Sequence, residues 1–457
     1  MLDFNGTVFF KMKSNMIHRL FLKLMTAFFV ISVLLIYGCI SSSTKLQVMK
    51  NPKGQPNVIH SAYKDAWSSL MDMQTDVDIL KGLSSDIDLI RFGKGLELIR
   101  NGCNEKAEEI FKVLIDSAYD PMVKEYSAKI YPNLLFNSGK FQQLYSYKEN
   151  SPAIDSGLLD ENVLINAFRS AAKEEYHFPE QKVKLPISIS KTGTPVVSVM
   201  INQKKFSFWI DTGAGLSVLS SEVATECGIQ QIGNETTTAG TATSKQVSIL
   251  PAIIDSLSIG GLQICNHPAI IIDKSELEFK LLGLFTIVKI DGIIGWNAIK
   301  NMYLEIDYAH HEIIINKPLR KEDLKSNFFW LGYPIVELVS ENGVLLYFGL
   351  DTGARTSSIT ENIFPKLESQ SIETKKEMIG SAGGFEKLER KILPHLVLHL
   401  GEYSLQFNDI KTLPSKGVVF IKSNGVLGSD IAAESKITID YINNFFGIES
   451  VMCHNEK

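Results

Sequence analysis

The sequence predicts a multidomain α+β protein, in which a helical N-terminal region precedes two related, mostly-β lobes. Three observations carry this prediction. Residues 60–175 place apolar side chains at helical spacing. A short acidic motif then occurs twice, and each copy stands among apolar runs separated by glycine and asparagine turns, as β-strands do. At 457 residues the chain is long enough for several domains.

Residues 1–39 have the pattern of an export signal. Arg19 and Lys23 precede an uncharged run over 24–37. Residues 36–39 resemble a bacterial lipobox, which implies cleavage before Cys39 and lipidation of its side chain. An uncleaved signal-anchor helix is the alternative, because about 17 to 20 apolar residues span a bilayer. Both alternatives predict a protein of the bacterial cell envelope, membrane-anchored and facing the periplasm or exterior.

The segment 40–59 is predicted to be a polar linker, since it contains Pro52, Gly54 and Pro56. Residues 60–175 follow as a helical domain. Within it, Ala107, Phe111 and Leu114 recur at helical spacing, and Asn101-Gly102 marks a turn.

The positions of Gly102, Ala107, Phe111 and Pro121 resemble part of a tetratricopeptide repeat. That resemblance implies a surface for a protein partner. A small helical domain packed on the lobes and a spacer from the membrane anchor are the alternatives, because isolated repeats need neighbours to bury their apolar faces.

Asp-Thr-Gly-Ala occurs at 211–214 and again at 351–354. Each copy follows an apolar run and precedes hydroxyl residues, which predicts a strand, a tight glycine turn and a second strand. A glycine, two apolar residues and a glycine follow at 292–295 and 425–428, and each is followed by Ile-Asp-Tyr. The spacing from the first glycine to the aspartate of that tripeptide is the same in both copies. The shared spacing indicates an internal duplication, with lobes over 183–318 and 325–450.

These paired motifs resemble the retropepsin-like aspartic peptidases, whose lobes have the acid-protease fold. The resemblance implies that Asp211 and Asp351 form a catalytic dyad that hydrolyses a peptide or protein substrate with activated water. It implies no metal or other cofactor. It also implies that the Thr212 and Thr352 hydroxyls bond across the lobe interface. Gly213 and Gly353 are then the residues that let the backbone approach the opposite carboxylate.

Two carboxylates within hydrogen-bonding distance share one proton, so one acts as base and the other as acid. The sequence does not determine which aspartate holds the proton. Ala214 and Ala354 offer no hydroxyl to the carboxylates. We therefore expect a dyad that titrates high, with an activity optimum at weakly acidic to neutral pH.

Glycine-rich segments suggest flaps over the substrate. Gly380, Gly383 and Gly384 lie in a segment that resembles the flap tip of retropepsins. In the first lobe Gly240 follows Asp211 at the same offset at which Gly380 follows Asp351. Ordinary hairpin turns are the alternative at both places.

The chain departs from the viral family members in one ion pair. The viral proteins have an acidic residue soon after the first motif and an arginine after the glycine-apolar motif. This chain has Gly215 and Trp296 at these positions in the first lobe, and Arg355 and Ser429 in the second. A reversed pair between Arg355 and Asp430 is the substitute that the sequence allows.

Cysteines, histidines and charge are less informative. Cys227 and Cys265 could form a disulfide or could both be free, and the spacing does not decide between these alternatives. His395 and His399 lie in an alternating, strand-like run, so we expect no metal site there. The net charge of −5 argues against a nucleic-acid partner.

The function predicted from these motifs is an exported, membrane-anchored aspartic endopeptidase. A catalytically inactive peptide-binding or scaffold lipoprotein with a peptidase fold is the alternative. A third arrangement pairs the lobes of two chains.

Overall fold

The computed structural model describes residues 45–59, 63–150, 161–233, 235–240, 246–281, 285–321, 324–367, 371–381, 384–413, 421 and 423–450. The predicted export signal and Cys39 lie outside these residues. From Lys45 onward the chain forms one compact unit, mixed α+β as the sequence predicts. Within the described residues, no helix is both long enough and apolar enough to cross a bilayer.

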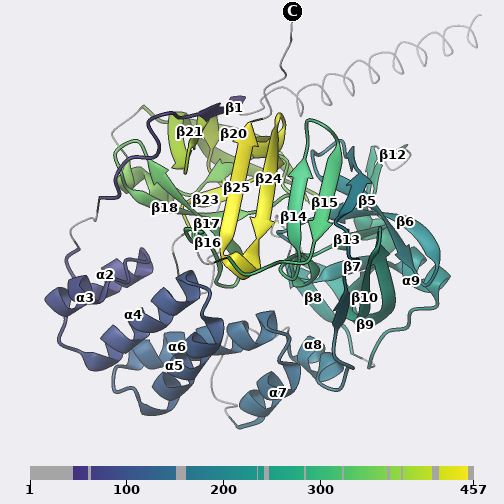
Figure 1. The fold of residues 1–457 in the computed structure, drawn as a ribbon, viewed down its shortest axis with the longest axis horizontal. Helices are drawn as coiled ribbons and strands as arrows, with labels where there is room; N and C mark the ends of the chain where they lie inside the picture. Colours follow the sequence, from purple (N-terminus) through teal and green to yellow (C-terminus); the bar gives the residue numbers. More distant parts are fainter. Residues whose placement is uncertain are drawn as a thin grey trace, which may run out of the picture. The chain divides into compact units, whose positions relative to one another are not determined.

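Helices occupy most of the region predicted to be helical, and they lie together along one side of the strands (Figure 1). Aspartates cap several of them; Asp86 and Asp120, for instance, accept hydrogen bonds from the first turns of α4 and α6. The helices are α2 (Ala66–Met71), α3 (Val77–Leu83), α4 (Ile87–Arg100), α5 (Asn104–Ser117), α6 (Pro121–Asn137), α7 (Phe141–Asn150) and α8 (Glu161–Phe168).

The helices share a core with the strands that follow. Phe92, Phe111 and Leu134 are buried in one apolar cluster with Phe329 and Tyr347, which belong to strands much further along the chain. The helical region is therefore packed on the β structure, an arrangement that burial of apolar area stabilises.

The first β half runs from β2 to β15 and includes two short α-helices. Most of its strands form a nine-stranded sheet in the order β2-β10-β7-β13-β6-β5-β9-β8, with β4 beside β5. The elements are β2 (Glu175–His177), β3 (Val183–Pro186), β4 (Ser188–Ile189), β5 (Pro195–Ile201), β6 (Lys204–Ile210), β7 (Ser217–Ser220), α9 (Ser221–Cys227), β8 (Thr237–Gly240), β9 (Gln246–Ile259), β10 (Leu262–Ile272), β11 (Glu278–Leu281), β12 (Phe285–Lys289), β13 (Gly292–Ile294), α10 (Trp296–Ile299), β14 (Tyr303–Asp307) and β15 (Glu312–Asn316).

The second β half runs from β16 to β25. Its main sheet also has nine strands, in the order β1-β22-β21-β17-β18-β23-β19, with β16 beside β17 and β20 beside β21. The strands are β16 (Phe328–Trp330), β17 (Pro334–Ser340), β18 (Leu345–Leu350), β19 (Ser358–Ile359), β20 (Glu373–Ser381), β21 (Gly384–Leu400), β22 (Tyr403–Lys411), β23 (Gly425–Leu427), β24 (Ser435–Asp440) and β25 (Phe445–Ser450). Short 3₁₀ helices occupy Lys274–Leu277, Glu361–Lys366, Ser429–Ala432 and Tyr441–Asn443.

Part of the segment predicted to be a linker is a strand. β1 (Lys45–Lys50) pairs antiparallel with β22 along its whole length, so the linker prediction for 40–59 is wrong over these residues. Leu46 and Val48 alternate with polar neighbours and pack against the core, which gives an edge strand one apolar face.

A five-stranded sheet joins the two β halves in the order β25-β24-β14-β15-β3. At its centre β14 and β24, which contain the two copies of Ile-Asp, pair antiparallel with Ile306 opposite Ile437. The duplicated segments thus meet about a local axis of near-twofold symmetry, and this pairing holds the two halves side by side.

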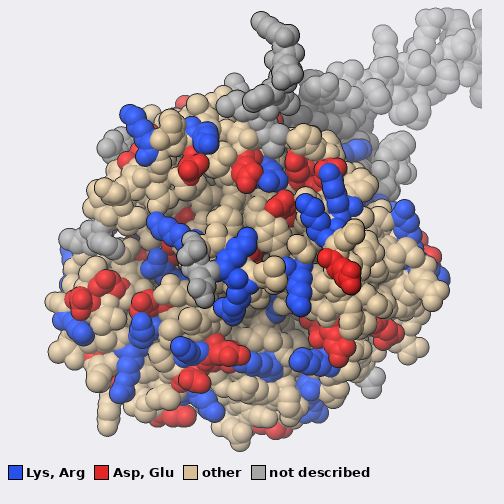
Figure 2. All heavy atoms as spheres, viewed as in Figure 1, with Lys and Arg blue, Asp and Glu red and all other residues tan. Residues whose placement is uncertain are grey.

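Asn202-Gln203, Gly260-Gly261 and Asn342-Gly343 predict hairpin turns, and these are confirmed where β5 meets β6, β9 meets β10 and β17 meets β18. Asn202 and Gln203 have φ values of 45° and 69°, as the two central residues of a type I′ turn require. Over the face in Figure 2, Lys and Arg side chains are interspersed with Asp and Glu.

Candidate active site

Asp211 and Asp351 stand at the ends of equivalent strands. β6 ends at Ile210 and β18 at Leu350, and each strand pairs in parallel with the strand of its own glycine-apolar motif, β13 or β23. That strand also supplies the carbonyl that binds the aspartate's backbone: Asp211 N–H donates to Ile294 at 3.1 Å, and Asp351 N–H to Leu427 at 2.9 Å. The duplicated motifs therefore build two matching loops.

The threonines of the two motifs hold the loops together. Each threonine is 1% exposed. Each hydroxyl accepts a hydrogen bond from the backbone N–H of the opposite threonine, and it donates to the carbonyl of the residue two positions before that opposite threonine. The four bonds are Thr212 N to Thr352 Oγ1 at 3.1 Å, Thr352 N to Thr212 Oγ1 at 3.0 Å, Thr212 Oγ1 to Leu350 O at 2.8 Å and Thr352 Oγ1 to Ile210 O at 2.8 Å.

Two glycines allow the loops to approach. A Cβ on Gly213 would lie 2.6 Å from the carboxyl carbon of Asp351, and one on Gly353 would lie 2.4 Å from that of Asp211. Neither distance is tolerated between nonbonded carbons. Only glycine therefore lets each loop lie against the opposite carboxylate, as expected from the sequence.

The two carboxyl groups are hydrogen-bonded to each other. Burial and then the charge of Asp351 raise the pKa of Asp211 to about 8. Burial also raises the pKa of Asp351, but the backbone of Ala354 and the hydroxyl of Tyr333 donate to that carboxylate and oppose the rise. Asp211 also accepts a backbone hydrogen bond, from Gly213 at 2.8 Å, so the Tyr333 hydroxyl is the donor that distinguishes the two carboxyl groups.

Tyr333 was not among the residues predicted from the sequence. It lies in the turn between β16 and β17, and its hydroxyl bonds to Asp351. The strand pairing makes Thr194 the equivalent residue in the first β half, because Val196 lies opposite Trp209 as Ile335 lies opposite Gly349. The Thr194 hydroxyl donates to the Gly353 carbonyl at 3.3 Å. Alignment of Gly193-Thr194-Pro195 with Gly332-Tyr333-Pro334 would have exposed this difference. Tyr333 supplies the hydroxyl that Ala214 and Ala354 lack.

A serine in each loop bonds to a second side chain, an amide in the first half and a carboxylate in the second. Ser217 donates to Asn297 Oδ1 from its backbone at 2.9 Å and from its hydroxyl at 3.2 Å. In the second half Ser357 donates in the same way to Asp430, at 2.8 and 2.6 Å. Asp430 is thus bonded to Ser357, and within the described residues no ion pair joins it to Arg355, so that alternative is wrong.

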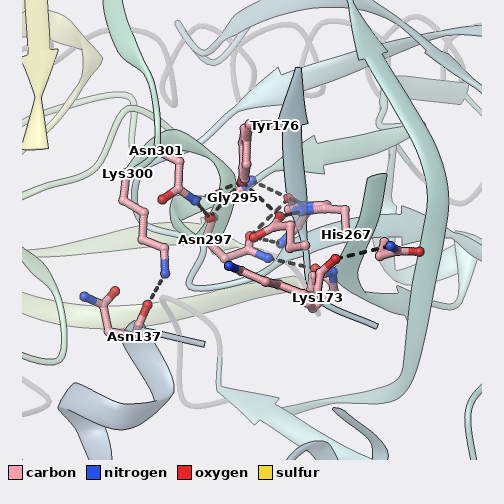
Figure 3. A network of polar contacts seen from close by, with 12 residues as sticks. Asn137, Lys173, Tyr176, His267, Gly295, Asn297, Lys300 and Asn301 are labelled. Carbon is pink, nitrogen blue, oxygen red and sulfur yellow. Dashed lines mark hydrogen bonds and ion pairs between the residues drawn. The ribbon is translucent and has the colours of Figure 1, made fainter. Parts of the chain in front are cut away.

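In the first half this support continues into a larger polar network (Figure 3). His267 Nε2 lies 2.7 Å from the Ser217 hydroxyl, and His267 Nδ1 bonds to Glu174. Asn297 Nδ2 donates to the Pro268 carbonyl at 2.7 Å. These contacts fasten the loop after Asp211 to β10 and to the chain before β2.

A cavity of about 170 Å³ lies beside the loop after Asp211. The α6–α7 hairpin, the loop after Asp211, α10 and the turn around Tyr333 all contribute to it. Its lining consists of Asn133, Phe136, Asn137, Gly139, Phe141, Glu174, Thr212, Gly213, Gly215, Leu216, Pro268, Trp296, Asn297, Lys300, Trp330, Gly332, Tyr333 and Pro334.

Hairpins occupy both segments suggested as flaps. Gly240 ends β8, which pairs with β9. Gly380 lies opposite Phe385, and Gly384 lies opposite Ser381, near the end of the β20–β21 hairpin. Gly383 lies outside the described residues. A substrate-covering role for these glycines stays a prediction.

Cys227 and Cys265 are both free, so the disulfide alternative is wrong. His395 and His399 lie in β21, which confirms the strand expected there. Among the described residues, no three His, Cys, Asp or Glu side chains are grouped as a metal site would require.

The raised pKa of Asp211 has a consequence for stability. The folded protein holds a proton that the unfolded chain releases near pH 4, so stability falls as pH rises from about 4 towards 8. We expect Asp211→Asn to stabilise the protein by a few kcal/mol at about pH 7 and by little at about pH 4. Thermal unfolding at both pH values measures this, with the exposed Asp255→Asn as control. An equal effect at both pH values would contradict the assigned pKa.

Residues 197–298 match a protein-family model described as Aspartyl protease. The match contains Asp211 and the Gly292–Ile294 strand of the first half, and it supports an aspartyl protease-like domain. Comparison with curated proteins gives no match.

Proposed function

We propose that this protein is an aspartic endopeptidase with two retropepsin-like lobes in one chain, whose dyad is Asp211 and Asp351. The observation that carries the proposal is the hydrogen-bonded carboxyl pair, placed by the reciprocal Thr212 and Thr352 bonds and enclosed by backbone from both halves. The family match over residues 197–298 agrees with this chemistry.

The geometry assigns a role to each member of the pair. Asp351, which accepts from Ala354 N–H and the Tyr333 hydroxyl, is the ionised member and takes a proton from the attacking water. Asp211, whose pKa is raised, holds the proton and donates it to the scissile carbonyl oxygen. The water oxygen bonds to the carbonyl carbon and a tetrahedral diol forms. When the C–N bond breaks, the leaving nitrogen takes the proton from Asp351, and a diol hydroxyl returns a proton to Asp211.

The proposal extends to the location of the protein. An N-terminal segment with the pattern of an export signal and lipobox, ending at Cys39, supports an envelope protein anchored in the membrane by lipid or by a signal anchor. The helical region, which resembles tetratricopeptide repeats, is proposed to be a partner-binding or substrate-positioning domain. The substrate is an extended peptide or an unfolded protein segment.

The test is cleavage of a diverse peptide library by the purified protein from pH 3 to 8, with products identified by mass spectrometry. We expect internal cleavage that is greatest at weakly acidic to neutral pH, because one proton must remain on the pair. No cleavage at any pH by folded protein would instead favour the inactive peptide-binding alternative. Activity that falls steeply on dilution would favour pairing of lobes between chains.

Tyr333→Phe should change the pH dependence of this activity. Loss of the hydroxyl removes a donor to the ionised Asp351, so the acid limb of the kcat/KM profile should move to higher pH, and kcat should fall by about tenfold. Phe keeps the aromatic ring. Tyr347→Phe, which removes a buried hydroxyl outside the dyad, is the control. An unchanged acid limb would show that Tyr333 has no part in ionising Asp351.

A further inference from the structure

We propose that the cavity beside the first catalytic loop is a substrate subsite for an aromatic or other large apolar side chain, and that the α6–α7 hairpin forms its outer wall. This inference rests on the proposed peptidase function. It assigns the helical region a direct part in substrate selection, in place of a spacer or a separate docking domain.

The position of the cavity places it next to the reacting groups. Thr212 and Gly213, which follow Asp211 directly, line it on one side. Tyr333, whose hydroxyl bonds to Asp351, lines it on another. A side chain in the cavity would therefore belong to a substrate residue close to the bond that is cut.

The size and walls of the cavity suit an aromatic ring. Its volume of about 170 Å³ is comparable to that of an apolar protein cavity of roughly 150 Å³ that binds benzene. The apolar and aromatic wall consists of Phe136, Phe141, Leu216, Trp296, Trp330 and Pro334. Burial of a ring against these side chains is favourable, and aromatic pairs add to that through their geometry.

The polar groups around the cavity already have partners (Figure 3). Lys300 Nζ donates to the Asn137 carbonyl, Asn297 Nδ2 donates to Pro268, and Glu174 accepts from Tyr176 at 2.9 Å. Burial lowers the pKa of Lys300 to about 8. An apolar guest leaves these bonds in place.

Asn137 fastens the helical wall to the β structure. Its Oδ1 accepts from Trp296 Nε1 at 3.2 Å, and its Nδ2 donates to the Tyr441 hydroxyl at 3.2 Å. The Phe141 ring packs on Phe136 and on Phe168, with centroids 5.4 and 5.2 Å apart. The end of α6 and the start of α7 are therefore held at the cavity, and Asn137 contacts both β halves.

The two catalytic loops differ at the residue that faces the cavity. Gly215 lies four residues after Asp211 and lines it, whereas the equivalent residue after Asp351 is Arg355. A Cβ on Gly215 would have no heavy atom within 4 Å. The first half has space where the second has a long side chain, which makes Gly215 the natural position at which to fill the subsite.

The first experiment compares cleavage preferences in the peptide library. The parent should prefer large apolar or aromatic residues over alanine by about tenfold or more, at one fixed position relative to the cut. Gly215→Phe fills the cavity and should abolish that preference, and Phe141→Ala should weaken it severalfold. Arg355→Phe inserts the same ring at the equivalent second-half position, and Phe364→Ala removes a half-buried ring elsewhere; both should retain it. An unchanged preference in Gly215→Phe overturns the proposal.

The second experiment does not depend on cleavage. Calorimetry on Asp211→Asn measures binding of hexapeptides that carry one phenylalanine at each position in turn, against the all-alanine peptide. We expect one phenylalanine position to bind about tenfold tighter, and Gly215→Phe in the same background to remove the difference. Tighter binding without cleavage by the parent would retain the subsite and refute the peptidase function. Equal binding of all peptides would refute the subsite itself.

Discussion

Replacing either Asp211 or Asp351 with asparagine is expected to abolish peptide cleavage, with kcat reduced by at least about 10³-fold in each single variant. In the proposed mechanism, loss of Asp211 removes the acid and loss of Asp351 removes the base, and neither carboxyl group replaces the other. The measurement is steady-state cleavage of the best library peptide near the pH optimum.

The double variant should be no less active than either single variant, because residues that act as one unit are not additive. Asp255→Asn, an exposed carboxylate in β9, is the matched control and should retain full activity. Asp430→Asn tests a buried carboxylate that supports the second loop without contacting the dyad, and it should lose far less. Appreciable cleavage by Asp211→Asn or Asp351→Asn would place the chemistry elsewhere.

Replacing Thr212 with valine should destabilise the protein by about 2 to 5 kcal/mol and strongly reduce activity. Valine keeps the shape but removes the hydroxyl. That change leaves the Thr352 N–H and the Leu350 carbonyl without their partners at a buried site. Thr352→Val should have an effect of similar size, since the four bonds are reciprocal.

Equilibrium urea unfolding at pH 7 measures the loss of stability, and cleavage at the same pH measures the loss of activity. Thr212→Ser retains the hydroxyl and should restore most of both. Thr225→Val, at an exposed hydroxyl in α9, is the control for the substitution itself. A change below about 1 kcal/mol in Thr212→Val would mean that the reciprocal bonds do not hold the loops together.

The local parts of the site were predictable from the chain alone. Asp-Thr-Gly-Ala after an apolar run specifies a strand that ends in a tight turn, and two copies in one frame specify two such turns. The hairpins at Asn202-Gln203 and Asn342-Gly343 were predictable for the same reason. In each case the deciding interaction lies within a few residues of sequence.

Contacts between distant segments were not predictable in this way. Tyr333 reaches Asp351 because β17 pairs antiparallel with β18 and places Ile335 opposite Gly349, and nothing near Tyr333 marks it as a donor. Lys45–Lys50 is part of a segment with the composition of a polar linker. It forms a strand because β22, near the other end of the chain, has an edge with which it pairs. The sequence allows a pair between Asp430 and Arg355, whereas the fold places the Ser357 hydroxyl on Asp430.

The sequence by itself determined the two aspartates, their supporting threonines and glycines, and the strands that lead to them, because local propensity and the repeated frame specify these features. Only the tertiary structure decided which carboxyl group has a tyrosine donor and which helices wall the adjacent cavity. Both depend on burial and on neighbours supplied by remote parts of the chain, such as Tyr333 and Phe141, and these environments arise only when the halves and the helices pack together.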